Sequence, residues 1–153
     1  MRPLARGDIV LVPFPFTNLA TTKRRPAVVL CVDSAQQDFT LAFVSSQESS
    51  TIGFGEVALP ANHHEFKPTG LTVPSKIRAA KLVTLNRSLI TRRLGRLGPT
   101  MIAELDIALI QALQIDLSPA QEVARLTERL RLGAIRESHG IDALVAELDS
   151  PTS

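Results

Sequence analysis

Three consecutive cations stand directly before an apolar run near the N-terminus, in the segment KRRPAVVL. A β-strand has no structural need for Lys23, Arg24 and Arg25 at its start. A guanidinium is a permanent fork of donors that matches phosphate oxygens, and it can stabilise charge on a phosphorane-like transition state. The cations therefore favour a phosphate-binding role. The alternative is a solvated loop that only increases solubility.

Hydroxyl and amide side chains follow the next long apolar run of the chain. Ser45, Ser46 and Gln47 come directly after residues 39–44. If this run and the preceding one form a hairpin, Arg25 and Ser45 lie at the same open end. A serine hydroxyl beside a guanidinium could hold an RNA phosphate for attack by its own 2′-hydroxyl without a metal ion. A slip of one residue would exchange Ser45 and Ser46, so the sequence leaves open which hydroxyl faces the phosphate.

Further cations lie in the second half of the chain and could supply additional phosphate contacts. They are Lys76, Arg78, Lys81, Arg92, Arg93 and Arg96. Among them we predict that Lys76 and Arg78 bind RNA. Aromatic residues are few, since there is no Trp and no Tyr. Stacking of bases on aromatic side chains is therefore poorly supported, although Phe14, Phe16 and Phe54 remain candidates.

A metal or cofactor site has little support in the sequence. His63, His64 and Glu65 are adjacent in a loop. Neighbouring histidines there are expected to point apart, and no third ligand is spaced to complete a coordination shell. The chain also lacks a Walker loop, a dinucleotide-binding fingerprint and a nucleophile elbow. We therefore expect neither a metal nor a cofactor.

The totals indicate a globular protein of ordinary size. A chain of 153 residues can form one domain with its own core, and 44% hydrophobic with 21% charged residues is not a disordered composition. No apolar run approaches the ~20 residues that span a bilayer, and the N-terminus does not resemble a signal peptide. The single cysteine, Cys31, is expected to be a buried thiol that cannot crosslink the fold. We expect a reduced, cytoplasmic protein without membrane association.

Short apolar runs bounded by Pro, Gly, Asp and Ser predict β-strands in the first hundred residues. These runs are residues 9–12, 27–32, 39–44, 56–59 and 90–97, the last being cationic and typical of an exposed edge strand. The segment 71–85 fits a strand imperfectly.

Helical patterns replace the strands after Gly98. Pro99 suits a first helical position, and apolar residues recur at three- and four-residue spacing over 99–115. Ser118 and Pro119 predict the start of a second helix that Gly133 ends, and residues 141–148 suggest a third. Strands followed by helices predict a mainly β, α+β fold, a small barrel or curled sheet with a helical C-terminus.

Charge divides the chain into two parts. Residues 1–115 carry 13 Lys and Arg against 8 Asp and Glu, whereas residues 116–153 carry 4 against 7. The division predicts a basic barrel domain over 1–115 with its C-terminal helix, and a helical acidic extension over 116–153. A polyanionic partner would suit the first part and an internal partner the second, although both could be ordinary solvated surfaces.

Several segments occur in an order that resembles one protein family. They are RGDIVLVPFPFTN, KRRPAVVLCVDS, FTLAFVSSQ and VPSKIRAAKLVTLNRSLITRRLGRLGP, followed by a helical pattern. Over roughly residues 6–115 the chain resembles the PemK/MazF-like toxins of bacterial toxin–antitoxin systems. The resemblance implies an SH3-like barrel that forms a homodimer, cleaves single-stranded RNA such as mRNA without metal, and is regulated by a cognate antitoxin.

The resemblance also implies roles for particular residues. The arginine of the family's Arg-Pro motif corresponds to Arg25 and would assist proton transfer and stabilise charge at the scissile phosphate. The family's threonine corresponds to Ser45, with Ser46 as the next candidate. Lys23, Arg24, Ser46, Gln47, Lys76 and Arg78 are the RNA-binding candidates. The implied products are a 2′,3′-cyclic phosphate, or a 3′-phosphate, and a 5′-hydroxyl.

Two departures from the family pattern matter for function. A serine in place of threonine keeps the hydroxyl but loses the methyl group that restricts χ1, so the donor is held less firmly. The extension 116–153 continues past the usual end of these toxins. It could cover the basic groove and restrain activity in cis, extend a dimer interface, or pack elsewhere on the barrel.

Two other classes of function remain open from the sequence. One is a barrel that binds nucleic acid without cleaving it. The other is a protein-interaction module, as in related barrels that inhibit DNA gyrase. Loss of RNA cleavage on replacing Arg25 would distinguish an enzyme from both.

Overall fold

The computed structural model describes residues 2–13 and 23–135. The chain separates into two compact units, residues 1–114 and 115–153. The first unit contains β1 (Asp8–Pro13), β2 (Arg24–Val32), β3 (Asp38–Ser45), β4 (Glu56–Leu59), β5 (Ser75–Asn86), β6 (Arg92–Arg96), α1 (Pro99–Ala112) and the short 3-10 helices η1 (Lys67–Thr69) and η2 (Arg87–Leu89). The second unit contains α2 (Leu117–Ile135).

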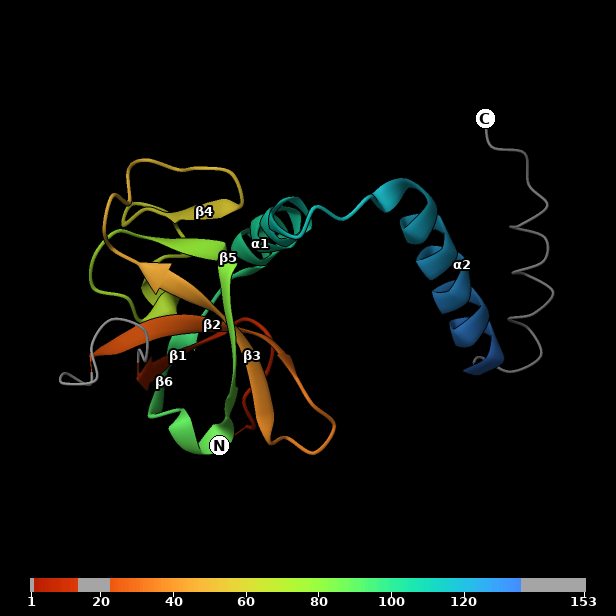
Figure 1. Cartoon of the computed structure of the whole chain (residues 1–153), viewed down its shortest axis with the longest axis horizontal. Helices are drawn as coiled ribbons and strands as arrows, with labels where there is room; N and C mark the ends of the chain where they lie inside the picture. Colours follow the sequence, from red (N-terminus) through yellow and green to blue (C-terminus); the bar gives the residue numbers. More distant parts are fainter. Residues whose placement is uncertain (1, 14–22, 136–153) are drawn as a thin grey trace. The chain divides into compact units, whose positions relative to one another are not determined.

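The six strands form one curled antiparallel sheet (Figure 1). Its strand order is β4-β5-β3-β2-β1-β6, so the first and the last strand of the chain lie side by side. Helix α1 packs beside β4 and β5. The predicted fold class, a curled β-sheet followed by C-terminal helices, is confirmed.

Both faces of the sheet are buried, which explains why several strands are continuous apolar runs. On one face, residues such as Val28 and Ile77 pack with Met101 and Leu105 of α1. On the other face a second cluster contains fully buried residues such as Phe39. Because alternate residues enter different clusters, the sheet holds its two faces in fixed register.

Strand β5 is a regular, twelve-residue element where the sequence pattern was weak. Its pairing with β3 is interrupted, because Ala42 pairs with Leu82 whereas the next residue, Phe43, pairs with Arg78. This bulge places extra residues on β5 and resets which side chains face the core. The alternation along the segment is therefore broken in the sequence although the strand is continuous.

Two sequence predictions are wrong in detail, and a third cannot be compared with the structure. Cys31 is exposed rather than buried, because the β2–β3 pairing shifts between Val29 and Cys31. Gly133 does not end the second helix, since α2 continues to Ile135; a glycine inside a helix costs only about 1 kcal/mol. The predicted helix over 141–148 lies outside the described residues.

A buried carboxylate from the loop after β4 holds the start of α1. Glu65 accepts hydrogen bonds from the backbone N–H groups of Thr100 and Met101, both at 2.9 Å. These bonds replace the cap that Gly98 lacks at the helix N-terminus. Burial raises the pKa of Glu65, but the two N–H groups, the Thr100 hydroxyl and the nearby His64 outweigh it, so the net pKa is lowered. The loop and the helix are therefore fixed to each other.

Within the described parts of the chain, no helix is both long and apolar enough to cross a membrane.

Candidate functional site

The hairpin of β2 and β3 brings the predicted catalytic residues to one end of the sheet. Its turn is closed by a hydrogen bond from Asp33 N to Asp38 O of 3.1 Å, so the predicted hairpin is confirmed. The register pairs Ala27 with Phe43. Continued by two residues, the same register sets Arg25 opposite Ser45.

A cavity of about 320 Å³ lies beside Arg25, and we call it the arginine cavity. It is lined by Leu11, Arg24, Arg25, Pro26, Val44, Ser46, Gly70, Leu71, Thr72, Val73, Ser75, Arg92 and Leu94. Three arginines and two serines thus line one space. The arrangement can hold an anion with several oxygen atoms, such as a phosphodiester.

Strand order explains why Arg92 joins this cavity. Leu11 of β1 pairs with Pro26 on one side and with Arg92 on the other. Strands in a sheet are about 4.8 Å apart, so Arg92 lies only two strands from the Arg24–Pro26 segment. Gly70, at a φ of 73°, closes the cavity from the loop, and a side chain there would collide with the backbone oxygen of Leu94.

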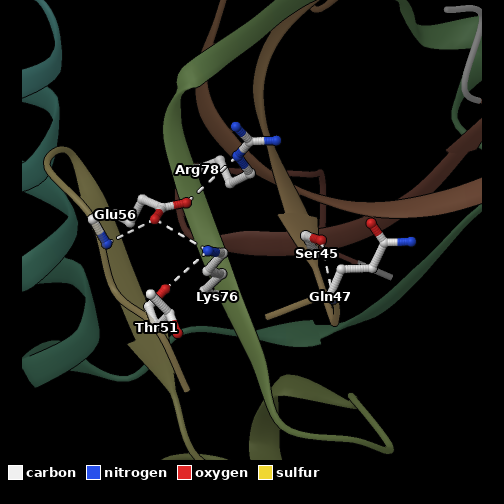
Figure 2. Close-up of polar contacts among 7 residues, drawn as sticks. Ser45, Gln47, Thr51, Glu56, Lys76 and Arg78 are labelled. Carbon is white, nitrogen blue, oxygen red and sulfur yellow. Dashed lines mark hydrogen bonds and ion pairs between the residues drawn. The ribbon is translucent and has the colours of Figure 1, made fainter. Parts of the chain in front are cut away.

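A second pocket of about 490 Å³ lies on the other side of Ser45, and we call it the Lys76 pocket. Its lining includes Ser45, Gln47, Glu56, Lys76 and Arg78 (Figure 2). The pairing of Ser45 with Lys76 and of Glu56 with Arg78 brings these side chains together from three adjacent strands. The 74% exposed ring of Phe54 also lines it.

The cations of the Lys76 pocket have an internal counter-ion. Lys76 Nζ lies 3.1 Å from Glu56 Oε1 and donates to Thr51 O at 2.9 Å. Arg78 Nε lies 3.5 Å from Glu56 Oε2. Burial raises the pKa of Glu56, but the Gly53 N–H, Lys76 and Arg78 outweigh it, so the pKa is lowered. Glu56 is therefore ionised at neutral pH and neutralises part of the positive charge.

This geometry gives the two cations of β5 different properties. Lys76 is only 7% exposed. Its contacts with Thr51 and Glu56 fix the loop between β3 and β4, which favours a positioning role. The side chain of Arg78 is 45% exposed, and its guanidinium keeps donors beyond the one that faces Glu56. RNA binding by either residue stays a prediction.

The Ser45 hydroxyl belongs to a residue that lines the Lys76 pocket. Its Oγ accepts a hydrogen bond from the backbone N–H of Gln47 at 3.2 Å. This bond orients the side chain and leaves its proton available for donation to a ligand. Ser46, the neighbouring residue, lines the arginine cavity instead.

The structure therefore distributes the predicted site residues over two adjacent spaces. Arg24, Arg25 and Ser46 line the arginine cavity. Ser45, Gln47, Lys76 and Arg78 line the Lys76 pocket. Lys23 is exposed and immediately precedes β2.

The sequence did not reveal the role of Glu56 in this region, and it named Arg92 only as one possible phosphate contact among several. Glu56 was read only as the start of a strand, and its charge gave no sign of its partners on β5. Arg92 was one of several scattered cations, and its place beside Arg24 depends on β6 pairing with β1. The signal that could have identified Glu56 is an acidic residue at the start of a strand in a chain whose other strands carry cations.

The histidine pair is arranged differently from the prediction. The rings of His63 and His64 stack with their centroids 4.5 Å apart instead of pointing apart. His63 Nδ1 accepts a hydrogen bond from the Glu65 N–H, while the Glu65 carboxylate binds α1. Among residues 2–13 and 23–135, no three His, Cys, Asp or Glu side chains gather as metal ligands.

Solved structures that share this fold include MazF proteins and an endoribonuclease. The chain is similar to MazF from Deinococcus radiodurans (Form-I), with 23% identity, a TM-score of 0.57 and coverage of 75% of this chain and 100% of that one. A MazE-MazF structure (Form-III) from the same organism gives 25% identity and a TM-score of 0.56 over the same shares. An endoribonuclease in complex with its cognate antitoxin, from Mycobacterial species, is 16% identical to this chain and gives a TM-score of 0.57. The similarity covers 74% of this chain and 97% of that one.

A family model extends this likeness to the sequence. A search of curated protein sequences found no match. The model of the PemK-like, MazF-like toxin of type II toxin–antitoxin systems matches residues 5–113, which include every predicted site residue. The chain therefore belongs to the PemK-like, MazF-like toxin family of type II toxin–antitoxin systems.

Proposed function

We propose that the protein is an endoribonuclease toxin that cleaves single-stranded RNA, including mRNA, and thereby inhibits growth. The observation that carries the proposal is the β2–β3 register, which pairs Ala27 with Phe43. Continued by two residues, this register would bring Arg25 and Ser45 opposite each other at the end of the hairpin. The arginine cavity beside it offers three guanidinium groups to a phosphate. Membership of a toxin family adds independent support.

The reaction that suits these groups is internal transfer of the phosphodiester. The 2′-oxygen attacks phosphorus, the bond from phosphorus to the 5′-oxygen breaks, and the 2′ proton leaves as a proton reaches the 5′-oxygen. The products are a 2′,3′-cyclic phosphate and a 5′-hydroxyl. Negative charge grows on the non-bridging oxygens in the transition state, and stabilising it is the main task of the protein.

Arg25 and Ser45 divide that task. A guanidinium remains protonated at any physiological pH, so Arg25 stabilises the developing charge and aids proton transfer without acting as the base. Ser45 donates its hydroxyl proton to a second phosphate oxygen, or Ser46 does so from within the arginine cavity. Because Arg25 supplies the positive charge, we propose that the reaction requires no metal ion.

We assign the remaining RNA contacts to exposed side chains that line or lie near the two spaces. Arg24 and Gln47 are exposed and border the two spaces, and Lys23 extends the same edge. Arg78 can reach a phosphate with its outward donors. Lys76 acts mainly by holding the Thr51 loop in place.

Partners are inferred from the relatives. A structure of an endoribonuclease with its cognate antitoxin shows the fold in such a complex. We infer that this chain likewise has a cognate antitoxin, forms a homodimer and acts in the cytoplasm, where mRNA is found.

The test is cleavage of a long single-stranded RNA in the presence of EDTA. We expect wild type to cut and Arg25→Ala to lose about 100- to 1000-fold in rate, as when one donor to an oxyanion is removed. Arg25→Lys is the matched control, since it keeps the charge and loses the fork of donors. Absence of cleavage by folded wild type would contradict the proposal and favour a barrel that only binds nucleic acid or protein.

A further inference from the structure

A third pocket, of about 470 Å³, lies along the β6 edge of the sheet, and we call it the outer arginine pocket. It is lined by Arg2, Pro3, Leu4, Arg87, Ile90, Thr91, Arg92 and Arg93. Four arginines thus surround a space whose other walls are partly apolar. A nucleotide combines a charged phosphate with an apolar base face, and such a pocket suits both parts.

One buried carboxylate orients half of these arginines. Asp8 has a side chain only 1% exposed, and Arg2 binds it through two hydrogen bonds of 2.6 and 3.2 Å. Arg93 Nη1 lies 3.8 Å from the same carboxylate. This nitrogen atom is buried and makes no hydrogen bond to the described part of the chain, so it faces Asp8 rather than a ligand. A ligand oxygen would contact Arg93 through the exposed part of its side chain, which is 28% exposed as a whole.

The other two arginines are not neutralised in this way. Arg87 is exposed, and its guanidinium lies over the Phe39 ring, 5.9 Å from the ring centroid, a cation–π contact that favours this position of the side chain. No ion pair joins Arg87 or Arg92 to an acidic side chain among the described residues. Asp8 offsets part of the charge of the four arginines that line the pocket, so a local excess of positive charge remains.

Arg92 connects this pocket to the proposed cleavage site, because it lines both the outer arginine pocket and the arginine cavity. Arg92 thus links a pocket lined by Arg87 to a cavity lined by Arg25. A ligand that spans both spaces must carry repeated negative charges along a flexible chain. Single-stranded RNA has this character, with one phosphate at each nucleotide.

We propose that the outer arginine pocket binds a phosphate of the RNA strand away from the scissile bond, with Arg87 and Arg93 as ligands and Arg2 and Asp8 as the groups that position them. The inference rests on the proposed function and adds a second binding site to it. Its consequence is that substrate affinity depends on RNA length: strands too short to reach past Arg92 lose this contact.

The experiment measures binding of 2′-O-methyl oligonucleotides, which cannot be cleaved, as mixed-sequence pools of tetranucleotides and dodecanucleotides over a range of salt concentrations. For wild type we expect the longer pool to bind more tightly and with a steeper salt dependence. Arg87→Ala should weaken binding of the dodecanucleotides about fivefold and reduce the salt slope by about 0.7, the value for one phosphate contact on a single strand. Binding of tetranucleotides should not change.

Two matched variants control for general charge. Arg87→Lys keeps the charge and should retain the salt slope. Arg96→Ala removes an exposed arginine of the same strand that does not line the pocket, about 13 Å along β6 from Arg92, and should bind both pools as wild type does.

The possible outcomes separate this inference from the proposed function. Equal binding of the long pool by wild type and Arg87→Ala overturns the pocket, even if wild type cleaves RNA. Binding that depends on Arg87, by a protein that does not cleave, supports the pocket and contradicts the proposed function. If a polyglutamate peptide binds and its binding depends on Arg87, while RNA does not bind, the proposal is overturned in favour of a site for an acidic polypeptide.

Discussion

The Lys76 pocket and the arginine cavity both contain predicted RNA ligands, but their charges are used differently. In the Lys76 pocket, Glu56 lies between Lys76 and Arg78 and neutralises part of their charge. In the arginine cavity, Arg24 and Arg92 are exposed, and neither is ion-paired to an acid among the described residues. Cations that look equivalent in a sequence thus divide into those that stabilise the fold and those that remain available to a ligand.

The largest effect on stability should come from breaking the neutralised cluster. Lys76→Met leaves the Glu56 carboxylate, whose side chain is 14% exposed, without its closest cation. We expect a loss of about 2 kcal/mol in the free energy of unfolding, measured by urea denaturation at neutral pH. Arg24→Met, in the arginine cavity, is the matched control and should change it by less than about 0.5 kcal/mol. Equal losses in the two variants would show that Lys76 contributes no more to the stability of the fold than Arg24 does.

Replacing each serine should show which space holds the scissile phosphate. We expect Ser45→Ala to lower kcat about tenfold, because it removes a donor to the phosphate, and Ser46→Ala to raise KM only a few-fold. Ser45→Thr restores the hydroxyl and restricts χ1, so it should match or exceed wild type. The reverse order of the two alanine variants would identify Ser46, rather than Ser45, as the donor to the phosphate.

Acid should weaken the fold through the two carboxylates whose pKa values are lowered. Glu56 and Glu65 titrate below their ordinary value of 4.5 in the folded chain. In the pH range below about 4.5 the unfolded chain takes up protons that the folded chain does not, so acid favours unfolding. The contribution of both groups is fully present above that pH and is lost as pH falls through the folded pKa.

Thermal unfolding from pH 7 to pH 3 checks this expectation. The Tm should change little through these groups above about pH 5 and fall below pH 4.5. Glu65→Gln should have a lower Tm at neutral pH and a shallower decline in acid, because it has no carboxylate to protonate. If the Tm of Glu65→Gln falls in acid as steeply as that of wild type, Glu65 does not contribute to the pH dependence of stability.

The smallest effect on the fold should come from removing the C-terminal extension. The unit of residues 1–114 holds both hydrophobic clusters, so a chain ending at Asp116 should keep its free energy of unfolding within about 0.5 kcal/mol. A larger loss would show that the extension completes the core. The RNA cleavage rate of the truncated chain tests whether the extension restrains activity. A rate higher than that of the full chain would identify the extension as a restraint in cis.

The sequence was most informative where one local pattern decided the structure. Apolar runs located the buried strands, and Pro99 located the start of α1. It was least informative where distant segments meet. The bulge that resets β5 depends on its pairing with β3, and the partners of Glu56 lie on another strand.

The candidate site follows the same division. Arg25 and Ser45 could be related through a hairpin, because the two strands are consecutive and their register follows from a short turn. Arg92 could not be assigned, because its position depends on the strand order of the whole sheet. Nor does charge alone reveal that Lys76 is buried against an acid.

The pairing of the first strand with the last also has a consequence for the chain as it is synthesised. Arg25 and Ser45 leave the ribosome early, whereas Arg92 and Arg93 belong to the final strand and take their places only when β6 pairs with β1. Contacts between such distant segments form late, because closing a long loop is entropically unfavourable. A nascent chain therefore carries the serine and the first arginines without the complete surface proposed to bind RNA, and this surface is assembled only once the whole sheet has emerged.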